Sequence, residues 1–243
     1  FRTRDQWLQL DLSGFKSPDP SDLSQQQITG TAYAADEASL ESVEEAVSAK
    51  QGRQSLPISW TAGAVPNSYQ FTVQGVVRTA QRSEVILAWD GQPLGAEGSG
   101  RTQIEVPPLG EFRLAQARAQ AQEEQAIVLN FSDPLNTAQD FTGMISLSGY
   151  NGSFRFLAQG NELRVYPSRP LSGQFRLTAE KAIQNSMGKP MSAAATWDLQ
   201  IEQPRPEVRL VGQGVILPSS DGLAFPFEAK GLDAVEVEIF KIY

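Results

Sequence analysis

A segment in the middle of the chain returns near its end. The sequence DGQPLG at 90–95, followed by IEVP at 104–107, reappears as MGKPMS at 187–192, followed by IEQP at 201–204. Five identical pairs, from Gly91 and Gly188 to Pro107 and Pro204, share an offset of 97 residues, the difference between 188 and 91. One Ig-like sandwich has about 100 residues. The repeat therefore predicts a tandem array of β-sandwich modules.

Composition narrows the range of functions. The chain has 243 residues, enough for two such modules and a remainder, and its net charge is −8 from 20 basic and 28 acidic residues. An acidic chain repels both a phosphate backbone and anionic lipid, so nucleic acid is not an expected partner. Cysteine and histidine are absent. Their absence excludes disulfides, thiolate or imidazole metal ligands, and Ser-His or Cys-His catalytic pairs.

The ends of the chain carry no recognisable targeting segment. The opening FRTR does not resemble the start of a signal peptide, and no apolar run approaches the roughly 18 residues that a membrane span needs. Both ends are interpreted as boundaries within a longer protein.

The first domain is predicted over 1–108. Apolar and polar residues alternate over 7–12 and 27–33, as in half-buried strands. Between Ser39 and Lys50 the period changes, because Leu40, Val43 and Val47 lie three and four residues apart and Gly52 follows. This spacing predicts one short amphipathic helix. Further strands are expected at 57–60, 69–73, 84–89 and 102–106, before the doublet Pro107-Pro108.

The second domain is predicted over 109–203, with strands at 126–131, 144–147, 154–156, 162–166, 174–178 and 196–201. Residues 115–125 are rich in Ala, Gln and Glu and have helical propensity. We nevertheless predict strand and turn there, because the counterpart at 208–211 is a β-type run. The fold class predicted is all-β, with tandem Ig-like or macroglobulin-type β-sandwiches and one short helix.

The remainder, 204–243, is predicted to be the start of a third domain. Strands are expected at 208–211, 223–229 and 235–242. About 40 residues are too few for a sandwich of about 100. We expect a small sheet that leans on the second domain.

Residues 186–189, Ser-Met-Gly-Lys, match the S-x-x-K nucleophile signature of penicillin-recognising enzymes. That signature requires a helix start and companion S-D-N and K-T-G elements. Here it lies in a Gly-Pro turn without those elements, so the match is interpreted as accidental.

Asp133, Asn136 and Asp140 offer oxygen ligands in one stretch, as a calcium loop would. No closing Glu of an EF-type loop follows. Asp and Asn also bond their own backbone in turns, which is the preferred interpretation.

Other candidate residues also have simpler interpretations. The acidic pairs Glu123-Glu124 and Glu44-Glu45 are interpreted as solvated surface rather than as an acid and base acting on a glycoside. The four tryptophans are expected in the cores rather than in a sugar-stacking platform: Trp7, Trp60, Trp89 and Trp197. Glycosylation sequons occur at 130–132 and 151–153. No catalytic, cofactor-binding or metal-binding residue is predicted.

Residues 206–243, PEVRLVGQGVILPSSDGLAFPFEAKGLDAVEVEIFKIY, resemble the start of a macroglobulin domain in bacterial alpha-2-macroglobulin-like proteins, the large protease traps of the cell envelope. LNFSDPL at 129–135, ELRVYP at 162–167 and GKP at 188–190 resemble the Ig-like modules that precede this domain in the Bacteroidetes branch. VILAWDGQPLG at 85–95 fits the same arrangement.

The resemblance implies a function for a longer parent protein. In that family the bait region, and the Cys-Gly-Glu-Gln thioester where there is one, lie far downstream, so no trapping residue falls within this chain. The implied parent inhibits endopeptidases and is a lipid-anchored lipoprotein facing the bacterial periplasm. This chain would be its non-enzymatic N-terminal scaffold, itself soluble and monomeric, without cofactors, with proteases bound elsewhere and an envelope protein as a further partner.

Two other classes of function stay open on the sequence. A surface adhesin or glycan-binding array could use the same modules, and it would be expected to show exposed aromatic clusters or calcium-bridged linkers. An accessory module of a polysaccharide-degrading enzyme would be expected to bind soluble glycans.

Overall fold

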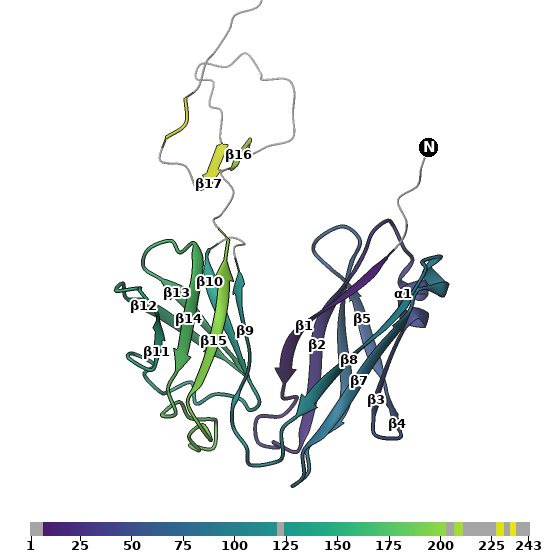
Figure 1. Ribbon diagram of the computed structural model, residues 1–243, viewed down its shortest axis with the longest axis horizontal. Coiled ribbons are helices and arrows are strands. Elements are labelled where there is room, and N and C mark those ends of the chain that lie inside the picture. The colour runs from purple at the N-terminus through teal and green to yellow at the C-terminus, as the bar shows by residue number, and fades with distance from the viewer. Residues whose placement is uncertain (1–6, 121–123, 203–206, 211–226, 231–233, 237–243) are drawn as a thin grey trace, which may run out of the picture.

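The computed structural model describes residues 7–120, 124–202, 207–210, 227–230 and 234–236. Most of its regular structure is β-strand (Figure 1). Every pairing between strands is antiparallel, and four of the sheets have three or four strands each. The all-β prediction is therefore confirmed.

Strands β1–β8 make up what we call the first unit. Two sheets, with strand orders β1-β2-β6-β5 and β4-β3-β7-β8, contribute to one core. The largest side chains in it with almost no exposure are Ile28, Phe71 and Leu87. The strands are β1 (Leu8–Lys16), β2 (Gln25–Ala34), β3 (Val47–Gln51), β4 (Gln54–Leu56), β5 (Ile58–Ala62), β6 (Ser68–Val77), β7 (Ser83–Asp90) and β8 (Ser99–Val106).

The helix of the first unit is shorter than predicted. Helix α1 (Leu40–Ala46) begins after Ser39, whose hydroxyl accepts a hydrogen bond from the backbone N–H of Ser42 at 3.1 Å, as an N-cap does. The prediction of helix to Lys50 is wrong, since Val47 already begins β3. Pairing with β7 along all of β3 outweighs the helical spacing, and β-branched Val47 favours a strand.

Strands β9–β15 make up the second unit, again with two sheets around one core. The strand orders are β12-β13-β10-β9 and β11-β14-β15. Strand β9 confirms the prediction of strand rather than helix after Leu114. The strands are β9 (Leu114–Gln120), β10 (Ala126–Phe131), β11 (Ile145–Leu147), β12 (Phe154–Gln159), β13 (Glu162–Pro167), β14 (Gly173–Ala179) and β15 (Ala195–Ile201).

The sequence repeat corresponds to the last strand of each unit. Ile104 lies in β8 and Ile201 in β15, and each of these strands pairs with the strand before it. The segments that lead into them differ. Gly91 has a right-handed backbone before the 3-10 helix η1 (Gln92–Leu94), whereas Gly188 has a φ of 75° in a turn. The repeat therefore preserves the strand position but not the loop conformation.

Beyond the second unit the structure describes a two-stranded ribbon. Strand β16 (Glu207–Leu210) pairs with β17 (Phe227–Lys230), in agreement with the expected strands at 208–211 and, in part, 223–229. The expected strand at 235–242 lies mostly outside the described residues. The expected packing of this region on the second unit, and the domain boundaries after 108 and 203, stay predictions. No helix in the described ranges is long and apolar enough to cross a membrane.

Candidate functional site

The most highly connected polar group in the described structure is the guanidinium of Arg78, at the junction of the two units. Arg78 follows the last residue of β6, and its side chain is 1% exposed. Nε donates to the carbonyl of Pro107 at 3.0 Å, and Nη2 donates to the carbonyls of Pro108 and Glu111 at 3.0 and 2.9 Å. Nη1 donates to the carbonyl of Ser132 at 3.3 Å and to the carboxylate of Asp133. All five N–H donors of a guanidinium are thus in use.

The carboxylate of Asp133 is equally buried, with a side-chain exposure of 1%. It follows β10 in the second unit, and its Oδ1 pairs with Arg78. Its Oδ2 accepts from Asn185 Nδ2 at 2.8 Å. The two charges are compensated and hydrogen-bonded, which a buried ion pair requires. Arg78 therefore joins the first unit to both the linker and the second unit.

A second contact joins β1 to β10. The side-chain amide of Asn130 behaves like the backbone of a neighbouring strand, since its Oδ1 accepts from Phe15 N at 2.7 Å and its Nδ2 donates to Phe15 O at 2.9 Å. Gly14, beside a register shift in β1, has a φ of 127°, and a Cβ there would lie 2.2 Å from Asn130 Cγ. Only glycine fits so close an approach with this backbone.

Two further hydrogen bonds extend the contact between β1 and the second unit. Asn161 Oδ1 accepts from the backbone N–H of Ser17 at 3.0 Å, while its Nδ2 holds the carbonyl of Phe131 at 3.0 Å. Gln116 Nε2 donates to the carbonyl of Leu12 at 2.9 Å. Figure 1 shows β1 along the side of the first unit that faces β9 and β10.

Four charged side chains surround the junction closer to solvent. Arg113 pairs with Glu105 at 2.6 Å and approaches Glu111 at 3.8 Å, and Arg82 lies 3.3 and 3.5 Å from the same two carboxylates. Their side chains are 25–57% exposed. We call these four residues the rim. Salt screens exposed pairs of this kind, whereas the buried pair is screened much less.

Part of this site could not be found from the sequence. From the sequence, Asp133 is a candidate calcium ligand or turn residue and Asn130 is part of a sequon, and none of these interpretations predicts their actual contacts. The turn interpretation of Asp133 is wrong, because its carboxylate is buried in the ion pair with Arg78, 55 positions away. No motif in the sequence singles out Arg78. Its one local signal is a charged residue directly after the apolar Val76-Val77.

Residues 186–189, which match S-x-x-K, form a turn next to the junction. Asn185 organises it, because its Oδ1 accepts from the backbone N–H groups of Met187 and Lys189 at 3.1 and 2.9 Å. Ser186 Oγ donates to the carbonyl of Pro20 at 3.2 Å, whereas Lys189 Nζ donates to the carbonyl of Gly110. The two side chains serve separate contacts rather than a nucleophile and base, as predicted.

The remaining oxygen-ligand candidates are turn residues, as predicted. Asn136 Oδ1 accepts from Ala138 N at 3.1 Å, and Asp140 Oδ1 accepts from Thr142 N at 2.9 Å. The hydrogen bond from Thr142 holds the pKa of Asp140 below its usual value. Within the described residues, no three acidic side chains are grouped so that they could hold a metal ion.

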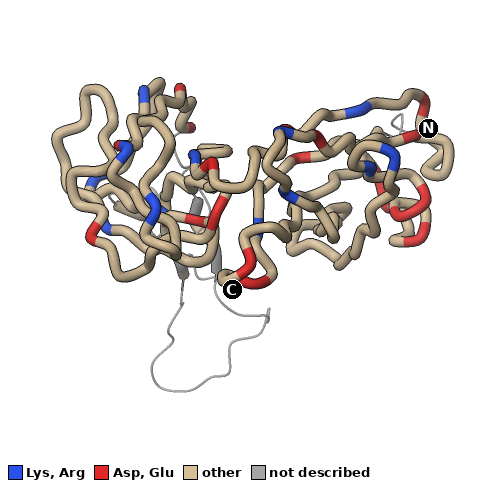
Figure 2. Tube along the Cα trace, turned by 90° about the horizontal axis from the view of Figure 1, so that it is seen from below, with Lys and Arg blue, Asp and Glu red and all other residues tan. Residues whose placement is uncertain are grey.

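The acidic pairs lie on the surface. Glu44 and Glu45 are exposed on α1, and Glu124 is exposed and paired with Arg155 at 2.6 Å. Glu123 lies outside the described residues. Basic and acidic positions are interspersed along both units (Figure 2).

Three of the four tryptophans lie where they were predicted. Trp60, Trp89 and Trp197 are half-buried and pack against the two cores. The prediction is wrong for Trp7, which is 47% exposed. In the alternating strand that follows, Leu8 takes the inward position, so its neighbour Trp7 points outward.

Comparison with models of known protein families gives no match for this chain. A search of curated proteins gives no similar protein either.

Removing one partner of the buried pair should destabilise the protein severely. We expect Arg78→Met to lower the free energy of unfolding by about 3–5 kcal/mol, because it leaves the Asp133 charge buried and four carbonyls without their donor. The measurement is urea unfolding. The matched control is Arg176→Met, which breaks an exposed pair with Asp198 and should stay close to wild type. Equal, small effects of the two substitutions would contradict the assignment.

Gly14→Ala should weaken the contact between β1 and β10. The matched control is Gly52→Ala, because Gly52 also has a positive φ but a Cβ there would meet nothing within 4 Å. The control should cost about 1–2 kcal/mol for its backbone alone. Gly14→Ala should cost clearly more in the same urea measurement. An undiminished cost in an Asn130→Ala background would show that the clash with Asn130 is not the cause.

Proposed function

We propose that this chain is a non-enzymatic structural spacer, in which the junction around Arg78 holds two β units in one arrangement. The observation that carries the proposal is the full use of the Arg78 guanidinium by acceptors from the linker and the second unit. Domains that only touch at a polar surface are expected to move relative to each other. A buried pair that cannot be broken without leaving an uncompensated charge opposes such motion.

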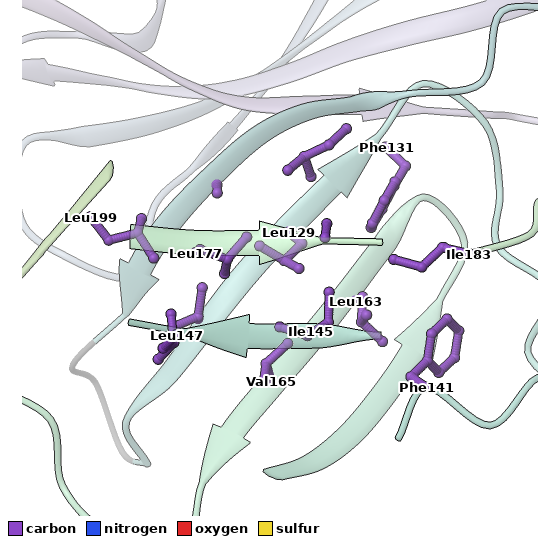
Figure 3. Close-up of a cluster of buried hydrophobic side chains, with 14 of the residues drawn as sticks. Leu129, Phe131, Phe141, Ile145, Leu147, Leu163, Val165, Leu177, Ile183 and Leu199 are labelled. Atoms are coloured by element: carbon purple, nitrogen blue, oxygen red, sulfur yellow. The ribbon is translucent and has the colours of Figure 1, made fainter. Parts of the chain in front are cut away.

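We propose further that each unit is an Ig-like sandwich. Support comes from the cores: in the second unit Leu129 of β10 and Leu177 and Leu199 of the opposite sheet meet in one cluster (Figure 3). Two facing sheets that share a core are the plan of a sandwich. Four sheets of this size could also form a small propeller-like ring. The sandwich is favoured because β2 pairs with β6 rather than with β3, whereas propeller blades use consecutive strands.

The parent protein that we propose is a bacterial alpha-2-macroglobulin-like protease trap of the cell envelope. The support is the resemblance of residues 206–243 and of the two modules before them. Within this setting the two units would set the distance between their flanking segments, and protease contacts would belong to other parts of the parent. The glycan-binding alternative has less support, because three of the four tryptophans pack against the cores.

The spacer proposal predicts that both units tumble as one body. Backbone 15N relaxation should give one rotational correlation time for amides of the first and second units, at low salt and at 1 M salt alike. Salt should loosen only the rim, because the buried pair excludes ions. Arg78→Met, studied where it stays folded, should give two shorter correlation times. Two separate times in the wild-type protein would refute the spacer.

The trap proposal predicts a specific response to proteases. The chain should be expressed within its full reading frame and incubated with a panel of endopeptidases, followed by gel electrophoresis and size-exclusion chromatography. One preferred cut, with the protease retained in a compact complex, is the expected result. The absence of cleavage and of complex formation with every protease would contradict the trap proposal but not the spacer proposal.

A further inference from the structure

A small cavity of about 230 Å³ opens at the edge of the first unit that carries α1. It lies where β4 stops. Strand β4 pairs with β3 only from Ala49 to Gln51, so Val47 and Ser48 extend beyond it. Pro57 follows β4 and lets the chain cross to the other sheet as β5. The cavity is bounded by α1, the start of β3, the end of β4, and β5.

One wall of the cavity is an aromatic ring held in place. Trp60 of β5 is half-buried and packs on Phe71, with ring centroids 5.4 Å apart and planes tilted by 51°. Ile58 and Leu56 continue this apolar wall. A fixed indole ring attracts a cation placed over its face.

The cavity is also lined by a carboxylate that has no partner among the described residues. Glu44 of α1 is exposed, and it makes no ion pair and no side-chain hydrogen bond to any described residue. It is the one charged side chain that lines the cavity, beside the hydroxyl-bearing Ser48 and Ser55. Glu41 and Glu45 on the same helix add negative charge nearby. The charge that lines the cavity is thus negative, which favours a cation.

A larger hollow on the second unit differs in this respect. It has a volume of about 630 Å³ on the face of β14 and β15, and its two charged residues are Arg176 and Asp198. They pair with each other at 2.8 Å, and the hydrogen bond from Arg176 lowers the pKa of Asp198. That hollow has no unpaired charge to select a ligand, whereas the cavity at α1 has one.

We propose that the cavity at α1 binds the Lys or Arg side chain of a basic polypeptide segment. Glu44 supplies the counter-charge, Trp60 supplies the face over which the cation lies, and the uncovered edge of β3 lies beside the segment's backbone. Sheet edges bind extended peptides in this way, with pockets that receive alternate side chains. The site gives the first unit a docking function that does not depend on the spacer role.

The test uses the whole chain and a short lysine-rich peptide with blocked ends. Binding is followed through the indole N–H resonance of Trp60 in 15N spectra, assigned with a Trp60→Phe variant. We expect saturable binding that weakens about fivefold in Glu44→Gln, the loss expected for one exposed ion pair of about 1 kcal/mol. Glu45→Gln is the matched control, because it removes the same charge from the same helix outside the cavity. It should change the affinity by less than about twofold.

Three results would overturn the proposal. Equal losses in Glu44→Gln and Glu45→Gln would show a diffuse acidic surface rather than a site. Unchanged binding of the same peptide with acetylated lysines would show that the site does not recognise a cation, since acetylation removes the charge. An unshifted Trp60 resonance at saturating peptide would place any binding elsewhere. Both glutamine variants are exposed and isosteric, so their amide spectra should match the wild-type fold.

Discussion

A buried guanidinium must have an acceptor for every donor, and this requirement shapes the junction of the two units. Arg78 meets this requirement with one carboxylate and with four backbone carbonyls, those of Pro107, Pro108, Glu111 and Ser132. Because these carbonyls belong to the backbone, no side-chain substitution removes them. Those carbonyls point at one centre only if the linker follows one path. The Pro107-Pro108 doublet narrows the conformations open to that path. The charge on Arg78 thus determines how the chain passes from one unit to the next.

The other contacts of the junction depend on this path. Once the start of the second unit is fixed, β10 lies close enough to β1 for Asn130 to pair with the backbone of Phe15, and Gly14 makes room for it. Asn185 links the same centre to the turn over 185–189, through Asp133 on one side and two backbone N–H groups on the other. The rim covers this arrangement with pairs that contribute little individually but favour the same orientation.

Much of the fold could be predicted because its signals are local. Alternating residues located β1, β2 and β15, and a continuous apolar run located β10. The β-type run at 208–211, the counterpart of 115–125, correctly outweighed helical propensity at β9. The junction could not be predicted, because it joins residues 29 to 144 positions apart that have no common pattern. The end of α1 was predicted wrongly for a similar reason, since the pairing of β3 with β7 from Val47 onward ends the helix. Local patterns identify strands, whereas contacts between units depend on tertiary packing.

The most direct test of a fixed junction is the distance between one point on each unit. The chain has no cysteine, so spin labels at Thr61→Cys in β5 and Gln159→Cys in β12, both exposed positions, are the only labels present. Pulsed electron paramagnetic resonance on frozen samples prepared at low and high salt should give one narrow distance distribution that salt does not change. A broad distribution, or one that shifts with salt, would contradict a junction held by Arg78 and Asp133.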